Sequence, residues 1–109
     1  MKELTEKVLQ FRNERNWSQF HNPKDLAISL SLEASELLEN FQWKTSEEAI
    51  EERMSDIKDE LADVIIYSIL LSYELGIDPK EAILQKIKKN ELKYPVDKAF
   101  NSKKKYTEL

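Results

Sequence analysis

Residues 57–71, IKDELADVIIYSILL, and residues 26–38, LAISLSLEASELL, decide the fold of this chain. In both stretches apolar residues recur at steps of three and four, which is the period of an α-helix. The two predicted helices are apolar around much of their circumference, so each needs cover on several sides. They therefore predict a central helix pair in an all-α domain.

Helix start and stop signals divide the rest of the chain. Thr45 and Glu48 form a capping-box pattern, and Pro23 suits the first turn of a helix. Asp78-Pro79 resembles an N-cap followed by the first helical position, and Gly76 suits a helix C-terminus. The predicted helices cover residues 2–15, 23–41, 46–75 and 79–91, with a break near 54–56 and an irregular tail over 96–109.

The length of 109 residues predicts a single domain, residues 1–109, because a second core would bury too little surface. Four helices with short connections predict an antiparallel four-helix bundle. The excess of apolar helix surface predicts that this bundle is completed by oligomerisation.

Composition excludes several kinds of site and partner. The chain has no cysteine and a single histidine, His21, which excludes thiolate chemistry and a multi-histidine metal site. A net charge of −4 disfavours polymeric nucleic acid as a partner. The first residues lack the apolar segment of a signal peptide, and no stretch is long enough to span a bilayer. We therefore expect a cytoplasmic protein without membrane contact.

Carboxylates occupy positions that the helix period assigns to apolar residues. Leu26, Leu30, Glu33 and Leu37 step by four, three and four, and Glu36 lies one turn after Glu33. Residues three apart share one helix face. The second helix of the pair repeats the arrangement, with Glu60 in the stripe and Asp63 one turn later.

If the two helices face each other, these acids converge. Buried carboxylates are costly unless they are paired or bind a cation, and no lysine or arginine lies in the apolar stripes of the two helices. An all-oxygen site suits Mg²⁺, or alternatively Mn²⁺. Other acids, such as Glu47 and Glu51, are interpreted as solvated.

Two aromatic residues lie at helical offsets from the acids. Trp43 is seven residues after Glu36, and Tyr67 is seven after Glu60. Both side chains could stack on a flat ring beside a metal-bound polyphosphate. Packing in the core is the alternative interpretation.

The run Glu33–Lys44, EASELLENFQWK, followed by Asp59–Tyr67, DELADVIIY, resembles the E-x-x-E…E-x-x-D signature of MazG-like all-α nucleoside triphosphate pyrophosphohydrolases. The resemblance is closest to the dCTP pyrophosphatase branch. It extends to residues 15–23 and 93–95 and to the tail 105–109, so it covers nearly the whole chain.

This resemblance implies Mg²⁺-dependent hydrolysis of a (deoxy)nucleoside triphosphate, dCTP or similar, to the monophosphate and pyrophosphate. It implies metal ligation by Glu33, Glu36, Glu60 and Asp63, and a homodimer or homotetramer. It places Trp17, Trp43 and Tyr67 around the base, Trp17 from a neighbouring subunit, and suggests sugar and phosphate contacts for Lys86, Asn90, Lys105 and Tyr106. Relatives carry a histidine near the base where this chain has Val8.

Two questions stay open from the sequence. Glu36 or Glu39 could activate the attacking water as the catalytic carboxylate. The chain could also be a non-catalytic helical module that binds nucleotides or only forms oligomers.

Overall fold

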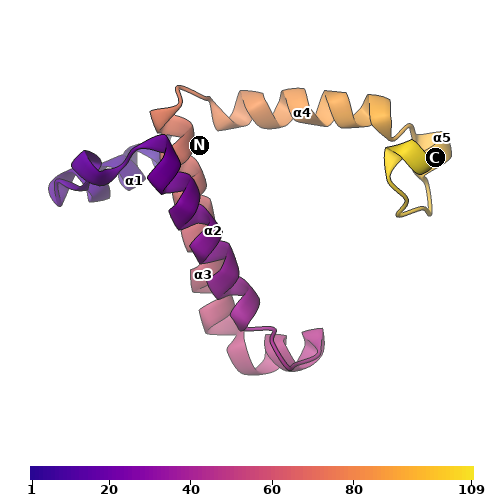
Figure 1. The fold of residues 1–109 in the computed structure, drawn as a ribbon, viewed down its shortest axis with the longest axis horizontal. Coiled ribbons are helices and arrows are strands. Elements are labelled where there is room, and N and C mark those ends of the chain that lie inside the picture. The colour runs from indigo at the N-terminus through magenta and orange to yellow at the C-terminus, as the bar shows by residue number, and fades with distance from the viewer. The chain divides into compact units, whose positions relative to one another are not determined.

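The computed structural model describes residues 1–109, and every regular element in it is a helix (Figure 1). The all-α prediction is thereby confirmed. The chain divides into two compact units, Met1–Ile77 and Asp78–Leu109, and each is described by itself. The elements are α1 (Lys2–Glu14), η1 (Trp17–Phe20), α2 (Pro23–Glu39), α3 (Ser46–Glu74), α4 (Pro79–Lys93), α5 (Val96–Ala99) and η2 (Tyr106–Glu108), where η marks a 3₁₀ turn.

The first unit is built on α2 and α3, which lie side by side and run in opposite directions (Figure 1). Leu26 of α2 and Ile69 and Leu70 of α3 are buried there, and Leu26 is only 1% exposed. Complete burial of one leucine stabilises a fold by about 1.5–3 kcal/mol. The central helix pair predicted from the apolar periodicity is therefore present.

Capping residues define the helix starts as predicted. The Thr45 hydroxyl accepts a hydrogen bond from the Glu48 backbone N–H, and the Glu48 carboxylate accepts one from the Thr45 N–H, each at 3.1 Å. Asn22 caps α2 ahead of Pro23, and Asp78 caps α4 ahead of Pro79. These side chains satisfy backbone donors that helix geometry leaves unpaired.

The end of the second helix and the break in the third lie at other residues than the sequence predicts. The second helix ends at Glu39 and not at Phe41, because the following residues form a turn in which Trp43 has a φ of 65°. The buried Asn40 side chain donates a hydrogen bond to the carbonyl oxygen of Glu36, 3.3 Å away, at this end. The break expected near residues 54–56 is present as a kink at the neighbouring Arg53, whose backbone angles are non-helical (φ −127°, ψ 16°).

The first helix is attached to α3 by an ion pair. The buried Arg12 guanidinium donates to the Glu74 carboxylate at 2.9 Å, and it also lies 5.3 Å from the centre of the Tyr73 ring. Phe11 and Trp17 meet edge to face at 5.7 Å, which joins α1 to η1. The ion pair and the aromatic contact hold the N-terminal segment beside the central pair.

The second unit consists of α4 and the C-terminal residues. The Tyr106 ring lies 6.0 Å from the Tyr94 ring and 4.9 Å from the Lys93 ammonium, so the chain end folds back onto the end of α4. The irregular tail predicted for residues 96–109 is wrong for α5 and η2, which are short helical turns. Backbone hydrogen bonds between residues three and four apart form these turns. The sequence has no apolar period there that would have predicted them.

None of the helices combines the length and the apolar composition that crossing a bilayer requires. Within the first unit, the structure shows the α2–α3 pair with α1 against it, and α4 belongs to the second unit. The complete bundle and its completion by another subunit remain predictions, as does the single domain.

Replacing Arg12 by Met should lower the free energy of unfolding by about 1–3 kcal/mol, because it leaves the Glu74 carboxylate half-buried without its partner. The matched control is Arg53→Met, since the Arg53 pair with Asp56 is exposed and 3.8 Å long. Such surface pairs contribute about 0–1 kcal/mol. Urea unfolding in metal-free buffer measures both variants, and equal losses would contradict a special role for Arg12.

Candidate functional site

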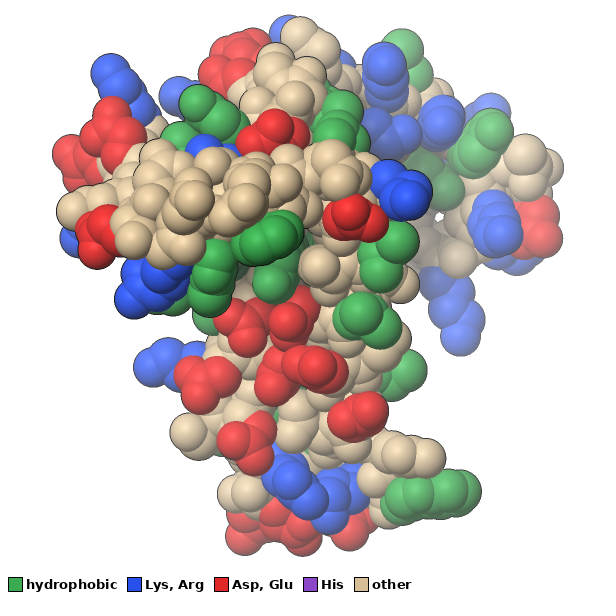
Figure 2. All heavy atoms as spheres, turned by 60° about the vertical axis from the view of Figure 1, so that its left-hand side comes forward, with side chains coloured by type: hydrophobic (Ala, Val, Ile, Leu, Met, Phe, Trp, Pro, Cys, Tyr) green, Lys and Arg blue, Asp and Glu red, His purple; other side chains and the backbone are tan.

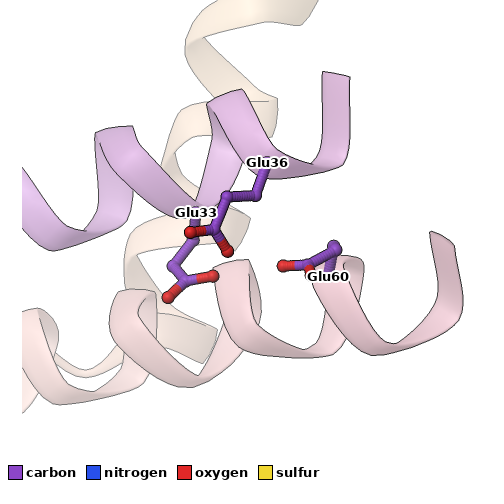
Figure 3. Close-up of side chains that lie close together, drawn as sticks. All are labelled: Glu33, Glu36 and Glu60. Carbon is purple, nitrogen blue, oxygen red and sulfur yellow. The ribbon is translucent and has the colours of Figure 1, made fainter. Parts of the chain in front are cut away.

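Three carboxylates meet between the central helices. Glu33 and Glu36 project from α2 toward α3, and Glu60 projects from α3 toward them (Figure 3). One oxygen from each lies within 4.8 Å of the others. The structure thus brings together three of the four predicted metal ligands, and we call Glu33, Glu36 and Glu60 the acidic triad.

The acidic triad has the chemistry of a cation site. One carboxylate oxygen of Glu33 and one of Glu60, Oε2 in each, is buried without a hydrogen-bond partner. None of the ion pairs in the chain involves the triad. A buried carboxylate oxygen that lacks a donor is strongly disfavoured unless a cation neutralises it. The all-oxygen donor set therefore fits a hard divalent cation.

The proximity of the acids changes their proton affinities. Burial, followed by the hydrogen bond and negative charge of Glu36, raises the pKa of Glu33 to about 7. Burial and Glu36 also raise the pKa of Glu60 above its ordinary value. The pKa of Tyr67 is raised by burial and by the charges of Glu33 and Asp63. Shifts of this kind mark sites where like charges are held together.

Asp63 lies close to the acidic triad without belonging to it. Its charge contributes to the raised pKa values of both Glu33 and Glu60. Asp63 and Glu33 also line the same pocket. Its predicted role as fourth ligand remains a prediction.

A mostly apolar pocket of about 460 Å³ lies on one side of the triad. Residues of α1, η1 and α3 form most of its wall, and Glu33 of the triad and the neighbouring Asp63 border it on the acidic side. The lining includes Val8, Phe11, Trp17, Ile66, Tyr67 and Leu70, with Lys7, Arg12, His21, Glu33 and Asp63 as its polar members. We call it the aromatic pocket.

A second hollow of about 440 Å³ is polar. It is lined by Glu36, Glu39, Asn40, Arg53, Asp56 and Glu60. Figure 2 shows acidic side chains gathered on one face of the central helix pair, directly beside hydrophobic ones. The acidic triad therefore lies between an aromatic pocket and a polar hollow.

The predicted aromatic residues are only partly brought together. Trp17 and Tyr67 line the aromatic pocket within one chain, so Trp17 reaches this pocket without a neighbouring subunit. Trp43 does not extend the acidic face of α2, because the helix ends at Glu39 and the Trp43 side chain is 92% exposed. The helical offset that suggested its position does not apply beyond Glu39.

Four predicted contact residues belong to the second unit. Lys86 and Asn90 are one turn apart on α4, and Lys105 immediately precedes η2. Tyr106 packs against Tyr94 in the same unit. Their contacts with a substrate remain predictions.

Sequence reasoning missed several residues that line the two hollows. Arg12 follows Leu4 and Val8 at steps of four, so a charged residue in an apolar stripe was visible there as it was for Glu33. His21 and Asp56 carried no comparable signal, because one lies in a connector and the other among many exposed acids.

The shifted Glu33 predicts a specific pH dependence of stability. Folded Glu33 keeps its proton up to a pKa of about 7, against an ordinary value of 4.5. The resulting stabilisation is complete below pH 4.5 and is lost as the pH rises through 7. In chelator-containing buffer the wild-type Tm should fall from pH 5 to 8, and Glu33→Gln should flatten that slope. The control Glu51→Gln, at an exposed position, should keep the wild-type dependence of Tm on pH. The same dependence in Glu33→Gln would contradict the raised pKa of Glu33.

Comparisons with known proteins identify the family of the chain. Residues 28–109 match the model of the MazG-like family. The chain is 40% identical to dCTP pyrophosphatase 1 of Homo sapiens and 38% identical to that of Mus musculus, in each case over 92% of this chain and 62% of the relative. It therefore spans less than two thirds of these curated relatives. A solved pyrophosphatase from Archaeoglobus fulgidus superposes with a TM-score of 0.82 at 44% identity, covering 87% of this chain and 92% of that one. This chain belongs to the MazG-like family.

Proposed function

We propose that the chain hydrolyses a nucleoside triphosphate, dCTP or a similar deoxynucleotide, to the monophosphate and pyrophosphate with Mg²⁺. The observation that carries the proposal is the position of the acidic triad directly beside an aromatic pocket, with Glu33 common to both. A triphosphate nucleotide needs both environments, because its base is flat and apolar on its faces while its phosphates are anionic.

The names of similar proteins support the reaction class. The curated relatives are called dCTP pyrophosphatases, and the archaeal structure is called a pyrophosphatase. The archaeal chain is matched over 92% of its length.

We propose Glu33, Glu36, Glu60 and Asp63 as the ligands of the cation, with Mg²⁺ as the preferred ion and Mn²⁺ as a substitute. When bound, Mg²⁺ supplies neutralisation of the phosphate charge and polarisation of the phosphorus centre. The protein contributes ligands fixed on two packed helices, so that little reorganisation is needed during reaction.

The chain's own residues orient the remaining reactants. Trp17 and Tyr67 receive the base in the aromatic pocket, which leaves the α-phosphate near the acids. Hydrolysis then forms a bond from a water oxygen to the α-phosphorus and breaks the bond to the α–β bridging oxygen. Glu39 takes the proton of that water, because it lines the polar hollow beside Glu36 and lies outside the acidic triad.

The proposal includes the assembly. Large apolar side chains on the central pair are exposed in one chain, among them Ile28, Leu32, Leu61 and Ile65. A second copy that covers them gives the homodimer or homotetramer, and the turn that carries Trp43 can then contact the base of a neighbouring copy. Lys86, Asn90, Lys105 and Tyr106 are proposed to contact sugar and phosphates. The protein acts on free cytoplasmic nucleotides, not on nucleic acid or at a membrane.

The first test is pyrophosphate release from dCTP with Mg²⁺ and with chelator. The proposed enzyme releases pyrophosphate and dCMP in equal amounts, and only with the cation. A module that only binds nucleotides would bind dCTP without releasing product, whereas a purely structural oligomerisation domain would do neither.

Glu36→Gln and Asp63→Asn should each abolish turnover while the oligomer remains folded, because each removes a proposed ligand charge. Asp59→Asn, an exposed neighbour on α3, is the matched control and should retain wild-type turnover. Glu39→Gln should lose turnover but keep wild-type Mg²⁺ affinity in calorimetry, which separates the base from the ligands. Wild-type turnover in both Glu36→Gln and Asp63→Asn would exclude the proposed metal site.

Trp17→Ala and Trp43→Ala should each weaken dCTP binding by about 1–3 kcal/mol, the usual contribution of a base–aromatic stack. Tripolyphosphate has no base, so its affinity should stay unchanged in both variants. Because Trp43 is almost fully exposed, its truncation should leave the Tm unchanged. Phe20→Ala, an exposed aromatic outside the pocket, serves as control. Equal losses of affinity for dCTP and for tripolyphosphate would exclude base stacking.

A further inference from the structure

The polar hollow is lined by one side chain that the fold buries. Asn40 is 8% exposed, whereas the other residues around the hollow are exposed or half-buried. Asn40 lies three residues after Leu37 and so continues the apolar stripe of α2, in which Glu33 is the other polar residue. Burial of an amide is costly unless its donors and its acceptor find partners. The partners of Asn40 therefore indicate what the residue does.

The fold uses the donor side of this amide. Nδ2 of Asn40 donates to the carbonyl oxygens of Glu36 and Leu37, at 3.3 and 3.5 Å, in the last turn of α2, where helix geometry leaves carbonyl groups unpaired. No group of the chain donates to its Oδ1. The two bonds of Nδ2 hold the amide in place, so that the lone pairs of Oδ1 stay available in the polar hollow.

The groups around Oδ1 determine what it can bind. The other residues that line the hollow are four acids and one arginine: Glu36, Glu39, Asp56, Glu60 and Arg53. Ionised carboxylates only accept hydrogen bonds, and the Arg53 guanidinium lies 3.8 Å from the Asp56 carboxylate. A molecule that joins Oδ1 to one of these carboxylates by hydrogen bonds must therefore carry two donors. Water is the smallest such molecule, and it is a reactant of the proposed hydrolysis.

Glu39 is the carboxylate best placed to share a water with Oδ1. It directly precedes Asn40 in the chain, lines the same hollow and lies outside the acidic triad. A water between these two acceptors has both of its hydrogens engaged. A lone pair of its oxygen is then held in a fixed direction, which reduces the entropy lost on reaching the transition state.

We propose that Oδ1 of Asn40 and the Glu39 carboxylate together hold the attacking water, which makes Asn40 a catalytic residue. This inference rests on the proposed function, in which Glu39 takes a proton from that water. The proton passes to Glu39 as the water oxygen bonds to the α-phosphorus and the bond to the α–β bridging oxygen breaks. The electron pair of the broken bond leaves with pyrophosphate. The second hydrogen of the water keeps its bond to Oδ1 and remains on the monophosphate.

The direct test is a crystal structure of the protein with Mg²⁺ and a dCTP analogue that has an NH group as its α–β bridge. One water should lie within hydrogen-bond reach, about 2.6–3.2 Å, of both Asn40 Oδ1 and the Glu39 carboxylate. An Oδ1 that instead binds Mg²⁺, or that contacts the analogue without a water, would overturn the proposal.

Two substitutions at Asn40 provide the kinetic test. Asn40→Leu keeps a similar volume and removes the donor and the acceptor, whereas Asn40→Asp keeps an acceptor oxygen and removes the donor. Asn40→Leu should lower kcat for dCTP about ten- to a hundredfold, the effect of losing one hydrogen bond to a reacting group. Its affinities for Mg²⁺ and for the analogue should stay at the wild-type values. Asn40→Asp should regain part of the lost kcat. A loss of Mg²⁺ affinity in Asn40→Leu would make Asn40 a metal ligand and would contradict the proposal.

A residue that only caps α2 predicts the opposite order of the two variants. A carboxylate is unfavourable at a helix C-terminus and beside other acids, so Asn40→Asp should have a lower Tm than Asn40→Leu in chelator-containing buffer. If turnover followed Tm, Asn40→Asp would be the less active variant, and a catalytic role would be excluded. The control is Thr45→Ala, which removes the N-cap of α3 outside the hollow. It should lower the Tm and keep the wild-type kcat.

The outcomes separate this inference from the proposed function. If the wild type neither binds nor hydrolyses dCTP, the proposed function fails. If it does both and Asn40→Leu keeps the wild-type kcat, the function stands and the role of Asn40 is excluded.

Discussion

The convergence of Glu33, Glu36 and Glu60 between α2 and α3 is the constraint on which the rest of the first unit depends. Like charges in a partly desolvated space oppose the packing of the two helices, and the raised pKa of Glu33 is the direct expression of that conflict. The helices still pack because Leu26, Ile69 and Leu70 are buried between them. Apolar burial thus holds together carboxylates that would separate in a more polar helix pair, and the proposed cation would convert their repulsion into stabilisation.

Under the proposed function, the acids determine where a nucleotide binds, and α1 shapes the pocket beside them. Phe11 and Trp17 contact each other at 5.7 Å, and the Arg12–Glu74 pair attaches their segment to α3. Without that attachment, the aromatic pocket would lose the wall that faces Tyr67. One buried ion pair therefore connects the packing of α1 to the site, although neither of its residues is proposed to touch the reacting phosphates.

Much of this arrangement could be predicted from the sequence because it follows from helix period and capping. Glu33 in a leucine stripe indicated the acidic triad, and Thr45 with Glu48 indicated the start of α3. The helical offset of Trp43 does not apply because α2 ends at Glu39, where the Asn40 side chain donates a hydrogen bond to the Glu36 carbonyl oxygen. The apolar period of a sequence does not reveal a side chain that bonds to the backbone at a helix end. His21 could not be predicted to line a pocket, because its position depends on how a short 3₁₀ connector packs and not on a repeating pattern.

The division of the site between two kinds of structure has a consequence for specificity. The acidic triad lies on long, mutually packed helices, where a change of register would move several carboxylates at once. Val8, Trp17 and His21 come from a short first helix and a connector that are attached through fewer contacts. Under the proposed function, substitutions there change the surface presented to the base without moving the carboxylates. Base preference can then change while the phosphate chemistry stays the same, because the two are built on segments that pack through separate contacts.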